Sequence, residues 1–555
     1  MALNIDKNIE ERKNMIKRDV GRLKGEAFDI LVIGGGITGA GIVRDAAMRG
    51  FKVALVEKGD FASGTSSKSS KLIHGGLRYL EQGDFKLVFD ACHERKILTH
   101  IAPHIVKPIQ FIMPIYKGDR RGRFKIRLGM ALYDILAGFQ NISKHQMLNR
   151  DKVLELEPAL NPEGLIGGTL FSDCQMNDAR LCLENILSAI EKGAVCLNYV
   201  EACGFIKENG RARGAYVKDL FSGEKLEVRA NVVINATGPW ADEVLSLSDA
   251  NHTRRLRPTK GVHLVVNNFK PNHAILSSTR SDGRMFFILP WGKNSLIGTT
   301  DTDYGLDLDR VSVDKTDVDY LLNETDRILT AAKITPESII AAFAGVRPLL
   351  SASGKASSIS REHTILESPS GIISVLGGKY TTYRLMAKEV VDRAVKRLKI
   401  SGIGDCSTHL IPVYGGGQVM GEMREKDDFT LHLIQTYGSR YNEVLDIAKC
   451  DERLKMRISP DHPHIAAEVV HAFQNEMAMT LSDFFLRRTW IGYSRSRGKD
   501  CINTVADILK RHLNFSEDEI ENQVKQYEVK QVVGATFMAP ADSGLINQTP
   551  TRRKH

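Results

Sequence analysis

Three glycines near the N-terminus have the GxGxxG spacing that allows a backbone to bind a phosphate group. They are Gly34, Gly36 and Gly39, and they follow an apolar, branched run, 28–33, that predicts a buried parallel strand. Gly34 permits a tight turn, and Gly36 lets the backbone approach a pyrophosphate. Gly39 lets the helix that follows pack closely on the strand.

The elements that must position these glycines follow in the order of a dinucleotide-binding unit. A helix is expected over 37–49, with its N-terminal amides directed at the phosphates. A second strand, 52–56, ends in Glu57, where a carboxylate would accept hydrogen bonds from an adenosine ribose. Strand, glycines, helix, strand and acid together predict a dinucleotide site, whereas a glycine-rich turn alone would indicate no function.

The chain after Glu57 favours FAD over a nicotinamide dinucleotide. A nicotinamide enzyme usually continues into another helix, but residues 59–81 are rich in glycine and in small hydroxyl residues. Such a composition suits a backbone wrapped on an extended ligand, with hydroxyl groups as donors. The expected donors are Thr65, Ser66, Ser67, Ser69 and Ser70.

A second segment of small residues, 232–240, predicts the return of the chain to the cofactor. A branched strand runs here directly into Ala236, Thr237 and Gly238, whose small size lets the backbone lie against a ligand. Because a long stretch separates this segment from the first glycines, we expect a cofactor domain with an inserted second domain.

The composition is that of ordinary globular material with two or three domains. The chain has 555 residues, of which 42% are hydrophobic and 26% are charged. Its eight cysteines form no CxxC motif and no tight cluster with histidine, so we expect reduced, mostly buried thiols. We therefore expect neither a disulfide nor a metal site.

Charge and hydropathy bear on where the protein is found. Residues 1–27 predict a charged, exposed helix without the apolar core of a signal peptide, and no stretch approaches the ~20 apolar residues of a spanning helix. The net charge of +9 and the basic end, Arg552 to His555, would favour an anionic substrate or an anionic bilayer. A modest excess over so long a chain is more often a solvated surface. We expect a cytoplasmic protein, with peripheral contact to the inner leaflet of the cytoplasmic membrane.

Helices and strands are expected between and after the two cofactor segments. The expected helices are 84–101, 130–138 and 178–192, and the expected strands are 193–200, 212–219 and 225–230. An exposed basic loop, 117–125, contains one aromatic residue, Phe124, so we expect no nucleic-acid partner. After residue 400, amphipathic helices are expected at 427–438, 464–477, 481–487 and 505–513. They would brace the catalytic core or mediate a homodimer.

Seven short strings occur in a characteristic order: GGGITGAG, GTSSKSSKLIHGGLRYLE, NATGPW, TKGVHLVV, IGTTDTDY, AGVRPL and GGKYTTYR. In this the chain resembles the FAD-dependent glycerol-3-phosphate dehydrogenases and the related glycerophosphate oxidases. The resemblance covers about 28–400, with a looser match at Asp483 to Thr489. It implies oxidation of sn-glycerol 3-phosphate to dihydroxyacetone phosphate by hydride transfer to FAD, with the electrons passed to a quinone.

The same resemblance implies an α/β architecture with a glutathione-reductase-type FAD-binding fold over 28–400. A substrate-binding domain with a mixed sheet would be interleaved in it, at about 100–230 and 255–345. Residues 401–555 would form a C-terminal helical domain. The resemblance also implies cofactor contacts beyond the glycines, Glu57 and the hydroxyl residues named above. These further positions are Leu72, His74, Ala236, Gly238, Gly378, Lys379, Tyr380 and Thr381.

A phosphate ester needs several converging cations, and arginine suits it because its planar fork pairs with two phosphate oxygens. Arg347, Lys379, and Arg78 with Tyr79 lie in loops of small residues, and by resemblance these are the substrate-binding positions. Outside such a context an arginine or lysine in a loop is ordinarily a solvated charge.

Alcohol oxidation also requires a base for the hydroxyl proton, and histidine is the natural candidate near neutral pH. His74 is flanked by glycines and can lie against the flavin ring, whereas His263 lies on an apolar strand where a buried structural histidine is also plausible. We favour His74 at the flavin and His263 as a second active-site group. With Arg347 they form the expected catalytic set, and either histidine can be the base.

Two other classes of protein stay open at this point. A flavin amine or amino-acid oxidase would need fewer cationic groups and no phosphate cluster. A non-catalytic dinucleotide-binding module would not need arginine, lysine and histidine gathered in small-residue loops. An oxidase that reduces O2 differs from a dehydrogenase in the access of oxygen to the reduced flavin.

Overall fold

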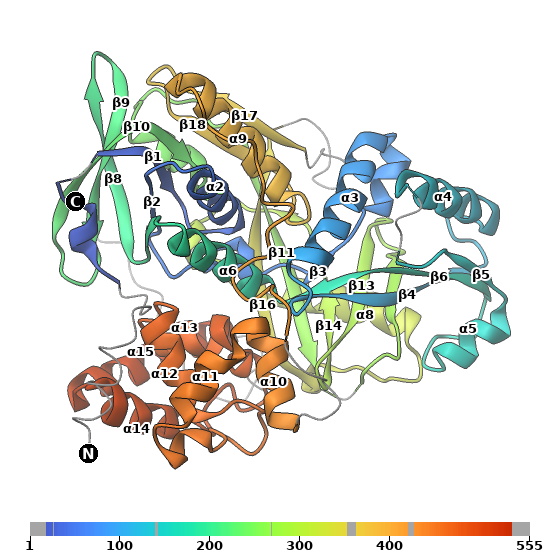
Figure 1. Ribbon diagram of the computed structural model, residues 1–555. Helices are drawn as coiled ribbons and strands as arrows, with labels where there is room; N and C mark the ends of the chain where they lie inside the picture. The colour runs from blue at the N-terminus through green and yellow to red at the C-terminus, as the bar shows by residue number, and fades with distance from the viewer. Residues whose placement is uncertain are drawn as a thin grey trace, which may run out of the picture.

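The computed structural model describes residues 18–25, 27–138, 142–267, 269–351, 362–419 and 427–535, without the side chains of Arg78, Gln82 and 530–535. Most of the expected N-terminal helix over 1–27, residues 1–17 and 26, lies outside the described residues. Its described part contains a short 3-10 turn, Val20–Leu23. The basic end of the chain also lies outside the described residues. The described chain forms two sheets and a helical C-terminal domain (Figure 1).

The first sheet carries the glycine-rich turn. Its strand order is β17-β18-β10-β1-β2-β7, and the four strands β10, β1, β2 and β7 are parallel neighbours. The bounds are β1 Ala27–Ile33, β2 Val53–Val56, β7 Val195–Leu197, β10 Lys225–Asn235, β17 His363–Glu367 and β18 Ile373–Gly377. Strand β1 is apolar on both faces because both faces are covered.

Helices pack on one face of this sheet and an antiparallel ribbon packs on the other. The helices are α2 Ile37–Met48, α6 Asp178–Glu191 and α9 Tyr383–Leu398, whose apolar residues share one core with β1 and β2. The ribbon consists of β8 Val200–Glu208, β9 Arg211–Asp219 and the first half of β10. The sheet is thereby shielded from water, and the turn after β1 is held rigidly.

The second sheet is mixed, with strand order β15-β11-β14-β13-β12-β4-β6-β3, while β16 pairs with β11 and β5 with β6. Its strands are β3 Leu72–Ile73, β4 Val106–Tyr116, β5 Gln146–Leu148, β6 Leu165–Met176, β11 Leu256–Val266, β12 Ala274–Ser278, β13 Met285–Trp291, β14 Asn294–Gly298, β15 Thr302–Asp303 and β16 Ile339–Leu350. Its helices are α3 Phe85–Ile101, α4 Arg123–Leu136, α5 Arg150–Leu156 and α8 Lys315–Ile328.

The expected boundary of the inserted domain differs from the boundary between the sheets. The stretch 178–235 was expected to lie largely in the inserted part, but α6 and strands β7 to β10 belong to the first sheet. The two expected strands 225–230 and 232–235 form one strand, β10, which pairs with β9 in its first half and with β1 along most of its length. Alternation of charged and apolar residues in that first half reflects one exposed face.

Helix α4 begins earlier than expected and includes the end of the predicted basic loop. Its buried residues Ile126, Met130 and Tyr133 recur at the spacing of a helix face, while Arg123 and Lys125 point to solvent. The helix 84–101 was predicted correctly, and Asp84 accepts a hydrogen bond from the Leu87 amide at its start.

The C-terminal domain contains α10 Asp428–Tyr437, α11 Tyr441–Ala448, α12 Ala466–Asn475, α13 Leu481–Asp483 with a π-helical continuation, Phe484–Arg488, α14 Ile502–Leu513 and α15 Glu517–Ala535. Four of these were expected, whereas α11 and α15 were not. They share their own apolar core and pack below the first sheet in Figure 1. Among the described residues, no helix is long and apolar enough to cross a bilayer.

Buried charges join this domain to the first sheet. Asp60, in the loop after β2, accepts hydrogen bonds from Arg487 Nε at 2.6 Å and Arg488 Nη1 at 2.8 Å. Glu476 pairs with Arg180 of α6, and its backbone carbonyl accepts from Arg488 Nη2 at 2.7 Å. The eight cysteines form no disulfide, and six of them are buried.

Candidate active site

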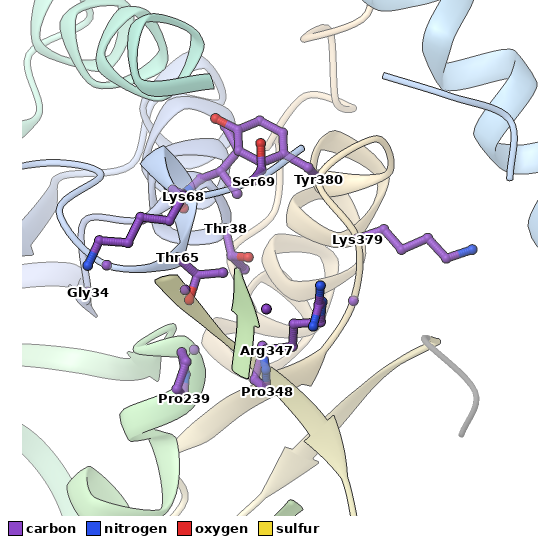
Figure 2. A pocket seen from close by; sticks show the side chains of 18 of the residues that line it. Gly34, Thr38, Thr65, Lys68, Ser69, Pro239, Arg347, Pro348, Lys379 and Tyr380 are labelled. Carbon is purple, nitrogen blue, oxygen red and sulfur yellow. The ribbon is translucent and has the colours of Figure 1, made fainter. Parts of the chain in front are cut away.

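A cavity of about 1050 Å³ lies between the two sheets, and residues far apart in sequence line it. The first sheet contributes the turn after β1, the end of β10 and the loop after β18, and the second contributes β11 and β16. Figure 2 shows Thr65 and Lys68, from the loop after β2, and Arg347, from β16, around this space.

The glycine-rich turn has the geometry that its sequence predicted. Gly34 has a φ of +109°, and a Cβ atom there would lie 2.7 Å from the carbonyl oxygen of Ala236. A Cβ atom on Gly39 would lie 1.9 Å from the carbonyl oxygen of Gly34, so Gly39 lets α2 pack against the turn and does not line the cavity. Gly36 does line it, just before the first turn of α2.

Glu57 is held in place by the backbone at the carboxyl end of β2. Its Oε2 accepts from the Gly35 amide at 2.6 Å and its Oε1 from the Gly59 amide at 2.7 Å. Each carboxylate oxygen keeps a lone pair for a further donor. The carboxylate lines the cavity and can accept a hydroxyl group such as that of a ribose.

The hydroxyl-rich loop lies against the cavity, but several of its hydroxyls serve the loop itself. Thr65 Oγ1 donates to the Val346 carbonyl at 2.6 Å, Ser66 Oγ accepts from the Ile37 amide at 2.9 Å, and Ser69 Oγ donates to Asp178 at 2.7 Å. Ser67 is buried and does not line the cavity. The hydroxyls were expected mainly as ligand donors, and these three are committed to holding the loop.

Arg347 lies on β16 with its guanidinium in the cavity wall. Its Nη2 donates to Thr299 Oγ1 at 2.8 Å and its Nη1 to Asp301 Oδ1 at 3.1 Å. A Cβ atom on Gly261 of β11 would lie 2.2 Å from the guanidinium, so the absence of a side chain there gives Arg347 its space. The side chain keeps 17% of its surface exposed, which leaves it open to an anion.

Lys379 and Tyr79 line the cavity together. The Lys379 ammonium lies 3.2 Å from the centre of the Tyr79 ring, and Lys379 follows Gly378, whose φ is +100°. Tyr380 and Thr381 continue this wall from the loop before α9. Arg78 lies in the turn Leu77–Gln82, and its side chain is outside the description.

His263 is buried in the wall formed by β11. Its Nε2 and Ser70 Oγ are 2.9 Å apart, and its ring stacks on Phe343 with centroids 5.1 Å apart. Burial, together with the positive charges of Arg347 and Lys71, holds the pKa of His263 well below its usual 6.5. The imidazole is therefore neutral near pH 7 and can accept a proton.

His74 also lines the cavity, and a backbone amide is hydrogen-bonded to its ring. Its Nδ1 accepts from the Gly76 amide at 3.2 Å, which assigns the proton of a neutral ring to Nε2. Its ring lies 6.2 Å from that of Phe287, which also lines the cavity. In this tautomer His74 offers a hydrogen-bond donor at Nε2.

Sequence reasoning missed several residues of this site. Lys68 and Arg284 line the cavity, and burial together with the positive charge of Arg487 lowers the pKa of Lys68 to about 8. Thr299 and Asp301, which hold Arg347, were within the string IGTTDTDY but no residue of it was singled out. Their role depends on the pairing of β11 with β14 and β16, which the string does not reveal.

Of the expected site residues, those that line the cavity come from six separate segments. They are Gly34, Gly36, Glu57, Thr65, Ser66, Ser69, Ser70, Leu72, His74, Tyr79, Ala236, Gly238, His263, Arg347, Gly378, Lys379, Tyr380 and Thr381. The cavity thus continues from a turn suited to a pyrophosphate to a wall with a cation and a neutral imidazole. That arrangement suits a dinucleotide together with a small anionic substrate.

Comparison with known proteins agrees with this arrangement. Residues 29–393 match the family described as FAD dependent oxidoreductase, and residues 406–520 match the C-terminal domain of alpha-glycerophosphate oxidase. A glycerol-3-phosphate dehydrogenase of Synechocystis sp. is 39% identical over 539 residues, which are 92% of this chain and 97% of the relative. An aerobic glycerol-3-phosphate dehydrogenase of Staphylococcus haemolyticus is 36% identical over 545 residues, 93% of this chain and 96% of the relative.

Among solved structures, the glycerol-3-phosphate dehydrogenase of Bacillus halodurans complexed with FAD aligns with a TM-score of 0.78 and 30% identity. The alignment covers 94% of this chain and 98% of that one. Both the FAD-binding fold and the helical C-terminal domain predicted from the sequence are therefore confirmed. The chain belongs to the FAD-dependent oxidoreductase family and, within it, to the glycerol-3-phosphate dehydrogenases.

Proposed function

We propose that this protein oxidises sn-glycerol 3-phosphate to dihydroxyacetone phosphate with FAD as its cofactor. The observation that carries the proposal is the position of Arg347 and His263. A cation open to an anion and a neutral imidazole line the same cavity as the GxGxxG turn. A phosphate ester of an alcohol needs both groups, and a hydride acceptor must lie beside them.

The described residues fit FAD. Gly36 and the start of α2 would hold the pyrophosphate, and Glu57 would accept from the ribose hydroxyls. The loop of Ser70 to His74 and that of Gly378 to Thr381 would lie along the flavin, since both line the cavity. When bound, FAD supplies the acceptor for the hydride of carbon 2.

The substrate phosphate would be held by Arg347, Lys379 and the segment of Arg78 and Tyr79. Thr299 and Asp301 fix the fork of Arg347, so that less side-chain entropy is lost when the phosphate binds. His263 would take the hydroxyl proton, because its ring is neutral and its Nε2 is hydrogen-bonded to the cavity hydroxyl of Ser70. His74 would donate from Nε2 to a group at the flavin.

Anaerobic reduction of the yellow holoenzyme tests this function. We expect glycerol 3-phosphate to bleach the flavin absorbance fully, and glycerol and D-amino acids to leave it unchanged at equal concentration. Bleaching by an amino acid would indicate an amino-acid oxidase, and a coloured protein that no substrate bleaches would indicate a non-catalytic flavin module. Replacing His263 by Asn should lower the rate of bleaching by about 10²- to 10⁴-fold, the usual contribution of a base.

The electron acceptor we propose is a membrane quinone, which the protein would reach while bound peripherally to an anionic bilayer. The exposed face of α4 supports this. Phe124 is 81% exposed, Leu128 and Ile135 are exposed on the same side of the helix, and Arg123 and Arg127 flank them. Such a face suits insertion into the boundary of headgroups and acyl chains.

Two measurements test the acceptor and the surface. We expect little hydrogen peroxide per substrate oxidised in the presence of a quinone analogue, whereas an oxidase would produce peroxide with or without it. We expect the wild-type protein to co-sediment with anionic vesicles and to be released only in part by molar salt, because apolar side chains insert as well. Phe124→Ser with Leu128→Ser should be released by salt completely. Equal binding by both proteins would exclude α4 as the contact.

A further inference from the structure

Two histidines and a glutamate gather in the C-terminal domain, away from the cavity already described. His432 lies in α10, His464 two residues before α12, and Glu468 in the first turn of α12. His432 Nε2, His464 Nδ1 and a Glu468 carboxylate oxygen all lie within 4.8 Å of one another. None of these three residues lines the cavity.

The distances around the glutamate suit shared coordination of an ion. His432 Nε2 lies 3.1 Å from Oε1 and 3.3 Å from Oε2 of Glu468, and His464 Nδ1 lies 2.9 Å from Oε2. In a tetrahedral site with bonds of 2.0–2.1 Å, the donor atoms lie about 3.3 Å apart. The histidine side chains are 13% and 12% exposed, so an ion can enter and small rotations can close the site.

The surroundings hold the carboxylate in place for such a role. The Ile465 amide donates to Glu468 Oε1 at 2.8 Å, and the buried Tyr437 hydroxyl donates to Oε2 at 3.1 Å. Partners of this kind orient a ligand and are typical of the second layer around a metal. Tyr437 is the last residue of α10, so its hydrogen bond to Glu468 already connects α10 with α12.

We propose that His432, His464 and Glu468 bind one divalent transition-metal ion of the zinc class. Two imidazole nitrogens and one carboxylate oxygen form a donor set that suits zinc better than calcium or magnesium, which prefer oxygen alone. The ion would fasten the middle of α10 to the start of α12. The expectation of no metal site missed this set, because one ligand is 32 residues before the next and no cysteine takes part.

Binding requires a lone pair on His432 Nε2 and on His464 Nδ1. In the metal-free protein the ring nitrogens facing Glu468 donate protons to it, and a bound ion needs lone pairs there instead. With an ion bound, the proton of His432 lies on Nδ1 and that of His464 on Nε2. No redox step is involved.

The test uses the full-length, FAD-loaded protein without a histidine tag, freed of metal by a chelator and gel filtration. Co²⁺ is titrated in as a probe, because its visible bands beyond the flavin absorption report tetrahedral coordination. We expect one Co²⁺ per chain, displacement by one Zn²⁺, and a higher melting temperature with Zn²⁺.

The partly exposed histidines are the informative variants, since Glu468→Gln removes a buried helix-capping group and can fail to fold. His432→Gln and His464→Gln should each weaken Co²⁺ binding at least about 100-fold, because even outer-shell changes cost about 10- to 100-fold. Their flavin content and anaerobic bleaching should not change. His512→Gln, another largely buried histidine of this domain near an aspartate, is the matched control and should bind Co²⁺ normally. Absence of Co²⁺ binding by the wild type, or unchanged binding by both variants, would identify the cluster as a hydrogen-bonded one only.

Discussion

Arginines at the domain joint and in the cavity are each paired with a carboxylate, but their surroundings differ. At the joint between the first sheet and the C-terminal domain, the Arg488 side chain is 1% exposed and shares Asp60 with Arg487. In the cavity, Arg347 is also paired with a carboxylate, Asp301, but keeps 17% of its surface open. The pair of Asp60 and Arg488 is closed to solvent, whereas Arg347 has an open side.

This difference separates a structural role from a binding role. A buried ion pair closed on all sides can only hold elements together, and removal of one partner leaves an uncompensated buried charge. An arginine fixed on one side and open on the other can bind an anion without reorganising. We therefore expect substitutions at the joint to change stability and substitutions in the cavity to change activity.

The largest effect is expected at the joint. Asp60→Asn leaves Arg487 and Arg488 with a neutral partner, so the free energy of unfolding should fall by about 3–5 kcal/mol. Chemical denaturation followed by far-UV circular dichroism measures this. Asp507→Asn, which breaks an exposed helical pair with Arg511, is the control and should cost at most about 0.5 kcal/mol. Equal effects of the two would refute a structural role for Asp60.

In the cavity, Arg347→Ala should act on catalysis and not on stability. Loss of a charge-assisted phosphate contact weakens transition-state binding by roughly 2–4 kcal/mol, so kcat/KM for glycerol 3-phosphate should fall about 30- to 1,000-fold. Flavin content and the denaturation midpoint should stay near those of the wild type. Arg257→Ala, which breaks a more exposed pair with Asp303 on the neighbouring strand, is the control. Near-normal efficiency of Arg347→Ala would remove it from the substrate site.

The joint should also respond to acid. Burial raises the pKa of Glu476, but Arg180, His471 and Arg488 outweigh it and hold that pKa at about 2, below the ordinary 4.5. Because the folded pKa is the lower one, the stabilisation is complete above pH 4.5 and is lost as the pH falls toward 2. At pH 3 the loss should be about 2 kcal/mol. Glu476→Gln should show a flatter dependence between pH 5 and 3, and an unchanged slope would contradict the assignment.

The smallest expected effect concerns the pH profile of the cavity. His263 has a lowered pKa, so its ring stays neutral and able to accept a proton as the pH falls through 6.5. We expect the acid limb of kcat/KM to lie below pH 6.5 in the wild type. Arg347→Lys keeps the positive charge near His263 and should leave the limb in place, whereas Arg347→Ala should move it to higher pH. If the acid limb of kcat/KM lies at pH 6.5 in the wild type, the pKa of His263 is not lowered.

Local patterns predicted the first sheet well, because short-range geometry dictates it. The strand before Gly34, the helix to Arg49 and the strand before Glu57 each depend on residues within one or two turns of each other. The same reasoning misplaced the inserted domain, since a strand such as β7 has no pattern that reveals which sheet it joins. It also missed α11 and α15 in the C-terminal domain.

By itself, the sequence determined that a GxGxxG turn, a fixed acid and two small-residue loops would meet a dinucleotide, because chain neighbours are constrained to one geometry. Tertiary structure alone decided that Thr299 and Asp301 hold Arg347, and that Gly261 clears space for it. It also decided that burial, together with Arg347 and Lys71, lowers the pKa of His263. It likewise brought His432 to His464 and Glu468. These contacts join strands and helices far apart along the chain, and their distances depend on packing that no local spacing encodes.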